Sequence, residues 1–232
     1  MDSDSLLPLS DSLELPVIDF SNQNLAPGTS KWDEVKDDVR KALEDYGCFQ
    51  AYVDSLWPDH GNQSISETMH KFSERSVELD VMARRMIMES FGIEKYLDEH
   101  LNSTYYVLRL MKYTSAPDDD VEETKTKDEK WIKVKPSQHC FIIMVGDFLC
   151  ALLNGRLYSP RHRVLMTANK TRYSSAMFSV PKPGVIIDSP EELVDEEHPR
   201  MFIPFEYNEF INFFHSEAGR KAESALHAFC AL

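Results

Sequence analysis

The sequence predicts an α+β fold with helices first, then a run of short strands that form a β-barrel or jelly-roll centre, then helices again. Apolar residues recur at helical spacing in the first hundred residues and again after residue 205, and they alternate with period two between these segments. Glycines and prolines separate the central strands. No internal repeat, glycine-rich phosphate loop or G-x-S-x-G elbow competes with this plan.

The first elements are a strand and a helix. Residues 15–20 predict a short strand, which Pro16 places at a sheet edge or a strand start. A helix is expected from Ser30, with Asp33 three residues later as a weak capping box, and Gly47 ends it. Its core face consists of residues at helical spacing: Trp32, Val35, Val39, Leu43 and Tyr46.

A second strand and a longer helix follow. Residues 48–53 are expected to be extended, and Ser64 with Glu67 forms a capping box for a helix that runs to Ser90. Gly92 stands where a C-terminal glycine is expected, and residues 93–97 add a short helical turn. The inward-facing positions of the long helix are Ile65, Met69, Phe72, Leu79, Met82 and Ile87.

The period changes to two at residue 104. Tyr105, Val107, Arg109, Met111 and Tyr113 fall on one face of a predicted strand. Residues 116–130 are almost wholly polar and predict a loop, and residues 205–232 return to helical spacing. Further strands are expected at 131–134, 140–145, 163–166, 173–180 and 184–187.

Composition limits the classes of partner. The 232 residues carry a net charge of −14 and are 42% hydrophobic, so the chain can fill a core but repels nucleic acid and anionic membranes. The four cysteines form no Cys-x-x-Cys pair, which disfavours a zinc ribbon or a redox dithiol. No secretory signal and no bilayer-spanning stretch is recognisable. We expect a reduced, cytoplasmic monomer with neither nucleic acid nor membrane as partner.

One histidine in the strand region suggests chemistry. Taken alone, His162 between two arginines is more often a surface residue than a metal ligand, and Arg172 is more often a salt-bridge residue. Together the two residues indicate a candidate iron site, because a histidine followed ten residues later by Arg-x-Ser suits an iron oxygenase built on a small barrel. The histidine would ligate iron and the arginine would bind a carboxylate of a keto acid.

The sequence around His162 forms a specific pattern. Its parts are Gly146-Asp147-Phe148-Leu149, Leu152-Leu153-Asn154-Gly155-Arg156, Ser159-Pro160-Arg161-His162-Arg163-Val164 and Arg172-Tyr173-Ser174, with Leu15-Pro16-Val17-Ile18-Asp19-Phe20 and Arg109-Leu110-Met111-Lys112-Tyr113-Thr114 upstream. Together these segments resemble the plant family of 2-oxoglutarate- and iron(II)-dependent dioxygenases, and within that family the AOP group, which modifies glucosinolate side chains. The resemblance covers nearly the whole chain.

The resemblance implies a fold, a reaction and roles for four residues. The fold is a double-stranded β-helix, or jelly roll, with packed N-terminal helices, and the reaction couples oxidation of a small-molecule substrate to conversion of 2-oxoglutarate into succinate. His162 matches the distal iron ligand. Arg172, Ser174 and Tyr113 match the residues that hold the far carboxylate of 2-oxoglutarate, since a guanidinium pairs with carboxylates in bidentate fashion. Iron(II) and 2-oxoglutarate are the implied cofactors, ascorbate can join them, and no side chain is assigned as a catalytic acid or base.

The chain departs from the family where the other iron ligands belong. The family's His-x-Asp should lie on the strand between Tyr113 and Trp131, and none of the eight histidines provides it. Only His215-Ser216-Glu217 has the spacing, but it falls in the C-terminal helical region, where side chains two residues apart diverge by roughly 200°. His139 and residues 118–120 are the nearest substitutes, and each is better explained as a solvated loop residue.

Two internal losses account for this departure. Sequence that the family carries is missing near residues 54–55 and between Thr124 and Lys125, with intact flanks on both sides. The chain then comprises a shortened N-terminal module at 1–100 and a shortened jelly-roll domain at 101–232, from which strands are missing. Skipped coding segments would explain the losses. Genomic DNA with no intron and no lost coding sequence between codons 124 and 125 would refute that hypothesis.

Three functions remain open from the sequence. The first is a dioxygenase-family chain that is inactive or strongly impaired because two iron ligands are absent. The second is a working dioxygenase with a rebuilt metal site. The third is a non-enzymatic remnant of the fold that binds a keto acid or a partner protein.

Overall fold

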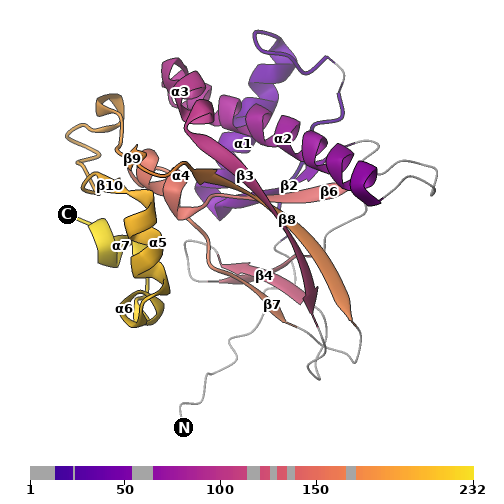
Figure 1. The fold of residues 1–232 in the computed structure, drawn as a ribbon. Coiled ribbons are helices and arrows are strands. Elements are labelled where there is room, and N and C mark those ends of the chain that lie inside the picture. Colours follow the sequence, from indigo (N-terminus) through magenta and orange to yellow (C-terminus); the bar gives the residue numbers. More distant parts are fainter. Residues whose placement is uncertain are drawn as a thin grey trace.

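The computed structural model describes residues 14–22, 24–53, 65–113, 121–125, 130–134, 139–165 and 171–232. Helices lie at both ends of the chain and strands between them, so the predicted α+β class is confirmed. In Figure 1 the N-terminal helices lie above the strands and the C-terminal helices lie to one side.

The helix α1 (Ser30–Tyr46) begins and ends with residues that satisfy its backbone. The Thr29 side chain, rather than Ser30, accepts the N–H of Trp32, so the predicted cap was one residue late. Gly47 ends the helix with a φ of 66° and donates its N–H to the Leu43 carbonyl. The predicted core face is confirmed except that Tyr46 is only half-buried.

Helix α2 (Ile65–Ser90) packs beside α1 and ends at the predicted residue. Ser64 lies outside the described residues, and so does the join near 54–55. Gly92, with a φ of 69°, turns the chain into a 3-10 turn, η1 (Glu94–Tyr96), and the short helix α3 (Leu97–Asn102). The inward faces of α1 and α2 bury most of their apolar residues against a small sheet.

That sheet has the order β1–β2–β6. β1 (Val17–Asp19) runs parallel to β2 (Cys48–Tyr52), and β6 (Cys140–Met144) pairs with β2 in antiparallel fashion. β1 is an edge strand, as the proline before it predicted.

A second sheet is a two-stranded antiparallel ribbon. β3 (Thr104–Tyr113) pairs along its whole length with β8 (Arg172–Pro181), from Thr104 opposite Pro181 to Tyr113 opposite Arg172. We call this pair the ribbon. One end of the ribbon lies under α2 and the other extends away from the helices (Figure 1).

A third sheet has the order β5–β4–β7 and corrects a prediction. β4 (Val121–Lys125) lies within the segment expected to be a loop, and it pairs with β5 (Trp131–Val134) and with β7 (His162–Leu165). Polar composition predicted a loop, but hydrogen bonding to a strand on each side and burial of Thr124 override that local preference. Residues 118–120 lie outside the described residues.

The remaining elements are short. The helix α4 (Asp147–Leu152) was not predicted, because six residues are too few to show a helical period. The helical C-terminal region is divided rather than continuous. Its described elements are β9 (Ile186–Ile187), η2 (Glu191–Leu193), β10 (Phe205–Glu206), α5 (Tyr207–His215), α6 (Glu217–Lys221) and α7 (Ala225–Cys230).

Two apolar clusters hold these elements together. The larger joins α1, α2 and β2 to α4, α5 and α7, and therefore draws residues from both predicted modules. The smaller lies between the first and third sheets and contains Leu15, Cys48, Ile132 and Val134. The division near residue 100 stays a prediction. Within the described residues no helix has both the length and the apolar composition needed to cross a bilayer.

The strands amount to an incomplete jelly roll. A jelly roll has eight strands in two sheets, whereas the ribbon and the β5–β4–β7 sheet together contribute five strands within the described residues. β6 is paired with the N-terminal strand β2 rather than with the ribbon. The edge of β8 that faces away from β3 therefore has no neighbouring strand in the described part of the chain.

Candidate functional site

Three of the predicted site residues meet on one face of the ribbon. Tyr113 lies opposite Arg172, and Ser174 lies two residues farther along the same strand, so all three side chains share a face. The guanidinium carbon of Arg172 is 5.3 Å from the centre of the Tyr113 ring. All three residues are half-buried. A guanidinium flanked by two hydroxyl groups is a donor set that suits a carboxylate.

His162 lies on a different sheet, at the start of β7. It pairs with Thr124, which in turn lies opposite Ile132. Thr124 and Ile132 are buried, and the Cys48 Sγ atom is 3.6 Å from the Thr124 Oγ1 atom, so this face of the sheet is turned toward the interior. His162 belongs to that face, yet it is exposed. The ribbon does not cover it.

The other ligands that iron would need are not assembled. Among the described residues no three histidine, cysteine or acidic side chains lie close enough to hold a metal ion. His139 is exposed on a left-handed backbone with a φ of 73°. Iron(II) in a two-histidine, one-carboxylate site therefore does not fit the described residues.

The His215-Ser216-Glu217 segment is a correction to the sequence prediction. His215 ends α5 and Glu217 begins α6, with Ser216 capping the second helix, so the two side chains do not belong to one helix. His215 and Glu217 therefore do not diverge around a single helix axis, and that prediction was wrong. Both side chains are exposed, and they form no metal-holding group with any other described residue.

Asp147, the first residue of α4, has contacts that no sequence pattern predicted. Its carboxyl group accepts a hydrogen bond from Ser159, and burial raises its pKa above the ordinary value. His227 and His162 are both close enough to oppose that rise. Asp147 thus binds the loop before β7 and lies near His227 of α7. The only sequence signal was its place in the Gly-Asp motif.

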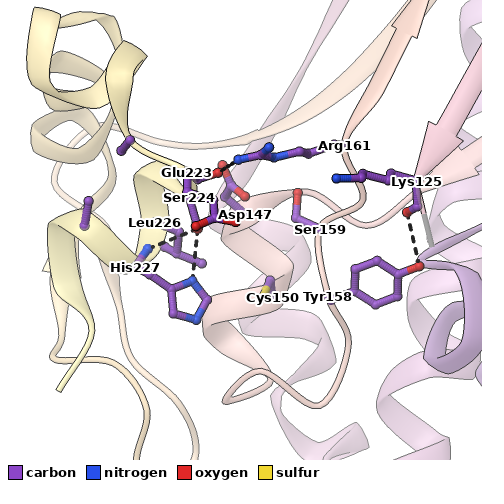
Figure 2. A pocket seen from close by; sticks show the side chains of 12 residues that line it. Lys125, Asp147, Cys150, Tyr158, Ser159, Arg161, Glu223, Ser224, Leu226 and His227 are labelled. Carbon is purple, nitrogen blue, oxygen red and sulfur yellow. Dashed lines mark hydrogen bonds between the residues drawn. The ribbon is translucent and has the colours of Figure 1, made fainter. Parts of the chain in front are cut away.

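Asp147 also lines a cavity of about 670 Å³ beside the C-terminal helices. Figure 2 shows its walls, which come from α4, the segment before β7 and the residues around α7. None of the four predicted site residues is among the described residues that line it. The polar and charged residues that line the cavity include Asp147, Ser159, Arg161, Glu223, Ser224 and His227.

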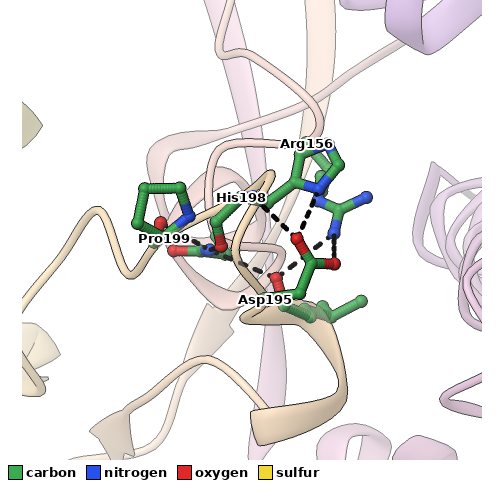
Figure 3. A network of polar contacts seen from close by, with 6 residues as sticks. Arg156, Asp195, His198 and Pro199 are labelled. Carbon is green, nitrogen blue, oxygen red and sulfur yellow. Dashed lines mark hydrogen bonds and ion pairs between the residues drawn. The ribbon is translucent and has the colours of Figure 1, made fainter.

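The Asn-Gly-Arg part of the motif proves to be a structural anchor. The Asn154 Nδ2 group donates to the carbonyl groups of Leu193, His198 and Pro199 at 3.2–3.3 Å, and its Oδ1 atom accepts the N–H of Met201 at 2.8 Å. Asp195 accepts hydrogen bonds from the side chains of Arg156 and His198 (Figure 3). These contacts fix the segment from Leu193 to Met201 against the end of α4.

Comparisons with known proteins agree with this geometry. Residues 105–181 match the model of the 2OG-Fe(II) oxygenase superfamily. The chain is 53% identical over 321 aligned positions to "Probable 2-oxoglutarate-dependent dioxygenase AOP1.2" of Arabidopsis thaliana, covering all of both chains. It is 33% identical over 392 positions to "Probable inactive 2-oxoglutarate-dependent dioxygenase AOP2" of the same plant, covering 95% of this chain and 98% of the relative.

The fold comparison points the same way. The crystal structure of JOX2 in complex with 2OG, Fe and JA superposes with a TM-score of 0.76 at 19% identity, covering 100% of this chain and 92% of the other. This similarity supports the jelly-roll fold alone.

This chain is shorter than the relative AOP1.2, which it matches over its full length. The alignment with AOP1.2 runs over 321 positions and this chain has 232 residues, so 89 positions of that alignment have no residue of this chain opposite them. The fold, the co-facial Tyr113, Arg172 and Ser174, and the full-length identity agree. The chain belongs to the family of 2-oxoglutarate- and iron(II)-dependent oxygenases and is similar to its AOP dioxygenases.

Proposed function

We propose that this chain is an AOP-like member of the dioxygenase family that is inactive or strongly impaired in oxidation. The observation that carries the proposal is that His162 has no set of companion metal ligands among the described residues. The residue opposite it on β4 is Thr124, and no metal-holding group of three side chains exists among the described residues. A lone histidine holds iron(II) poorly, since the family uses two histidines and one carboxylate.

The open interior is a second support. Two rings on the face that carries Arg172 remain exposed, Tyr105 at 44% and Phe178 at 42%. A jelly roll with complete sheets would bury such rings between them. Even with iron bound, a site that water reaches freely would protect a reactive intermediate poorly. The losses near residues 54–55 and 124–125 would explain both the missing ligands and the missing cover.

Substrate and cofactor assignments rest on the family. We infer that the ancestral reaction used iron(II) and 2-oxoglutarate on a glucosinolate side chain, because the chain is similar to the AOP dioxygenases over its full length. We expect the chain to be a cytoplasmic monomer from a family whose substrates are small molecules. The assignment of His162 as an iron ligand and of Tyr113, Arg172 and Ser174 as carboxylate-binding residues belongs to the same proposal.

Turnover tests the main proposal. The purified chain is supplied with iron(II), ascorbate, oxygen and 2-oxoglutarate, and succinate is measured against the Arabidopsis relative AOP1.2 as the positive control. We expect succinate release at background level. Sustained release that His162→Ala abolishes would show a rebuilt metal site and refute the proposal.

A second candidate function is favoured by the intact carboxylate-binding face. Tyr113, Arg172 and Ser174 lie on paired strands and do not require the missing segment for their register. We propose that they bind 2-oxoglutarate without iron, with Arg172 pairing to the far carboxylate. Calorimetric titration in the presence of a chelator should detect binding that Arg172→Ala removes and that Arg163→Ala, an arginine on β7, leaves unchanged. Equal binding by both variants would refute this candidate.

A further inference from the structure

The ribbon differs in charge from the rest of the molecule. Its two strands contain three basic residues and no acidic residue, in a chain whose net charge is −14. The guanidinium carbon of Arg109 lies 4.9 Å from the centre of the Phe178 ring, and the Lys112 Nζ atom lies 5.9 Å from the centre of the Tyr173 ring. Both cations therefore extend from β3 across the rings of β8, one on each face of the ribbon.

These two cations have no acidic partner within the part of the chain that the structure describes. The recorded ion pairs among described residues lie on the helices, on the turns and in the segment from Asp188 to Arg200, and none includes Arg109 or Lys112. The rings beside them are also open to solvent, with Tyr173 71% exposed. A basic, aromatic surface is thus available on both faces of β8.

The free edge of β8 provides the other half of a binding surface. Residues 173–180 are all uncharged and include no proline, so the edge carries neither the charged side chains nor the prolines that often block strand addition. No recorded backbone hydrogen bond joins these residues to any described segment other than β3. Figure 1 shows β8 at the outer side of the ribbon, away from the β4–β7 strands.

We propose that the free edge of β8 binds an acidic, extended segment of a partner protein, which adds to the ribbon as a third strand. Backbone hydrogen bonds along residues 173–180 would supply affinity, and acidic side chains on the two faces of the added strand would meet Arg109 on one face and Lys112 on the other. Nucleic acid is the less favourable partner because it has no peptide backbone that could pair with the edge of β8. The proposal goes beyond the proposed function and does not depend on binding of 2-oxoglutarate.

Labelled peptides test the proposal on the full chain. A ten-residue peptide of glutamate, valine and threonine is titrated by fluorescence anisotropy, beside a lysine counterpart and an acidic peptide with prolines at both odd and even positions, which lacks N–H donors on both edges of its backbone. Hydrogen exchange locates the contact. Only the first peptide should bind, and it should slow exchange at the amides of residues 173–180.

Charge-reversal variants identify the cations. The double variant Arg109→Glu with Lys112→Glu should weaken binding by about tenfold or more, because like charges would then face one another. The matched control, Lys31→Glu with Arg75→Glu, changes the net charge equally on α1 and α2 and should bind as the wild type does.

Four results would overturn the proposal. They are an acidic peptide that fails to bind, a proline-containing peptide that binds equally well, a control variant that loses as much affinity as the ribbon variant, and a single-stranded oligonucleotide that binds more tightly than the acidic peptide. The peptide comparison does not depend on any variant folding correctly.

Discussion

The helical body, which comprises α1, α2, β2 and the C-terminal helices, buries its large apolar side chains, whereas the ribbon leaves its own partly exposed. In the body, α1, α2, β2 and the C-terminal helices bury large side chains such as Trp32, Phe49 and Phe210 almost completely. In the ribbon, only Thr104 and Pro181, which pair at its anchored end, are buried. Alternation along a strand creates an apolar face, but a neighbouring sheet is needed to bury it. Among the described residues the ribbon has no such neighbouring sheet hydrogen-bonded to β8.

The largest effect should come from truncating the body. Phe49→Ala removes a fully buried ring that stacks 6.0 Å from Phe20, and it should lower the free energy of unfolding by about 3–5 kcal/mol. The matched change in the ribbon, Phe178→Ala, should cost less than about 1 kcal/mol because that ring is already partly solvated. Urea denaturation of both variants measures the contrast. Equal losses would show that the ribbon is packed as tightly as the body.

An intermediate effect should follow from removing the anchor at Asn154. Asn154→Ala leaves the N–H of Met201 and three carbonyl groups without the partner described above, in a site where Asn154 is 2% exposed. We expect a loss of about 3 kcal/mol. Thermal unfolding checks the stability, and exchange at the Met201 amide checks the location. Unchanged protection of that amide would show that Asn154 does not anchor the segment from Leu193 to Met201.

A smaller effect on stability, dependent on pH, should come from His100, which lies on α3 just before the ribbon begins. His100 is buried on Phe148, and burial, aided by Arg84, lowers its pKa from 6.5 to about 3. The folded state therefore keeps His100 neutral while the unfolded state protonates it below pH 6.5. Stability is full above pH 6.5 and falls by about 1.4 kcal/mol per pH unit as the pH drops through the window from 6.5 to about 3.

His100→Phe tests this dependence because it keeps the ring and removes the titrating group. Between pH 6.5 and 5 the wild type should lose about 2 kcal/mol more than the variant, measured by urea denaturation at each pH. Parallel losses in the two proteins would mean that His100 gains a proton in the folded state, and that its site is more open than its burial indicates.

Much of the fold could be predicted from local signals. Helical spacing and glycines at positive φ located α1, α2 and their ends, and alternation located β3 and β8. β4 could not be predicted, since its acidic residues form a strand only through pairing with β5 and β7. α4 is too short to show a period.

The candidate site also has parts that local sequence patterns predict and parts that depend on long-range packing. Alternation places Arg172 and Ser174 on one face, but only the register of β3 against β8 places Tyr113 beside them. The contacts of Asp147 depend on how α7 packs, which no local pattern encodes. The absence of a His-x-Asp motif between Tyr113 and Trp131 is visible in the sequence itself, and the role of His162 stays a prediction.

Anaerobic titration with iron(II) and 2-oxoglutarate tests the central claim most directly. In a working site of this family, iron chelated by the keto acid gives a visible charge-transfer band. With a single histidine available, we expect no such band at stoichiometric iron, even though 2-oxoglutarate itself binds. A saturable band at one iron per chain, lost on His162→Ala, would contradict the account.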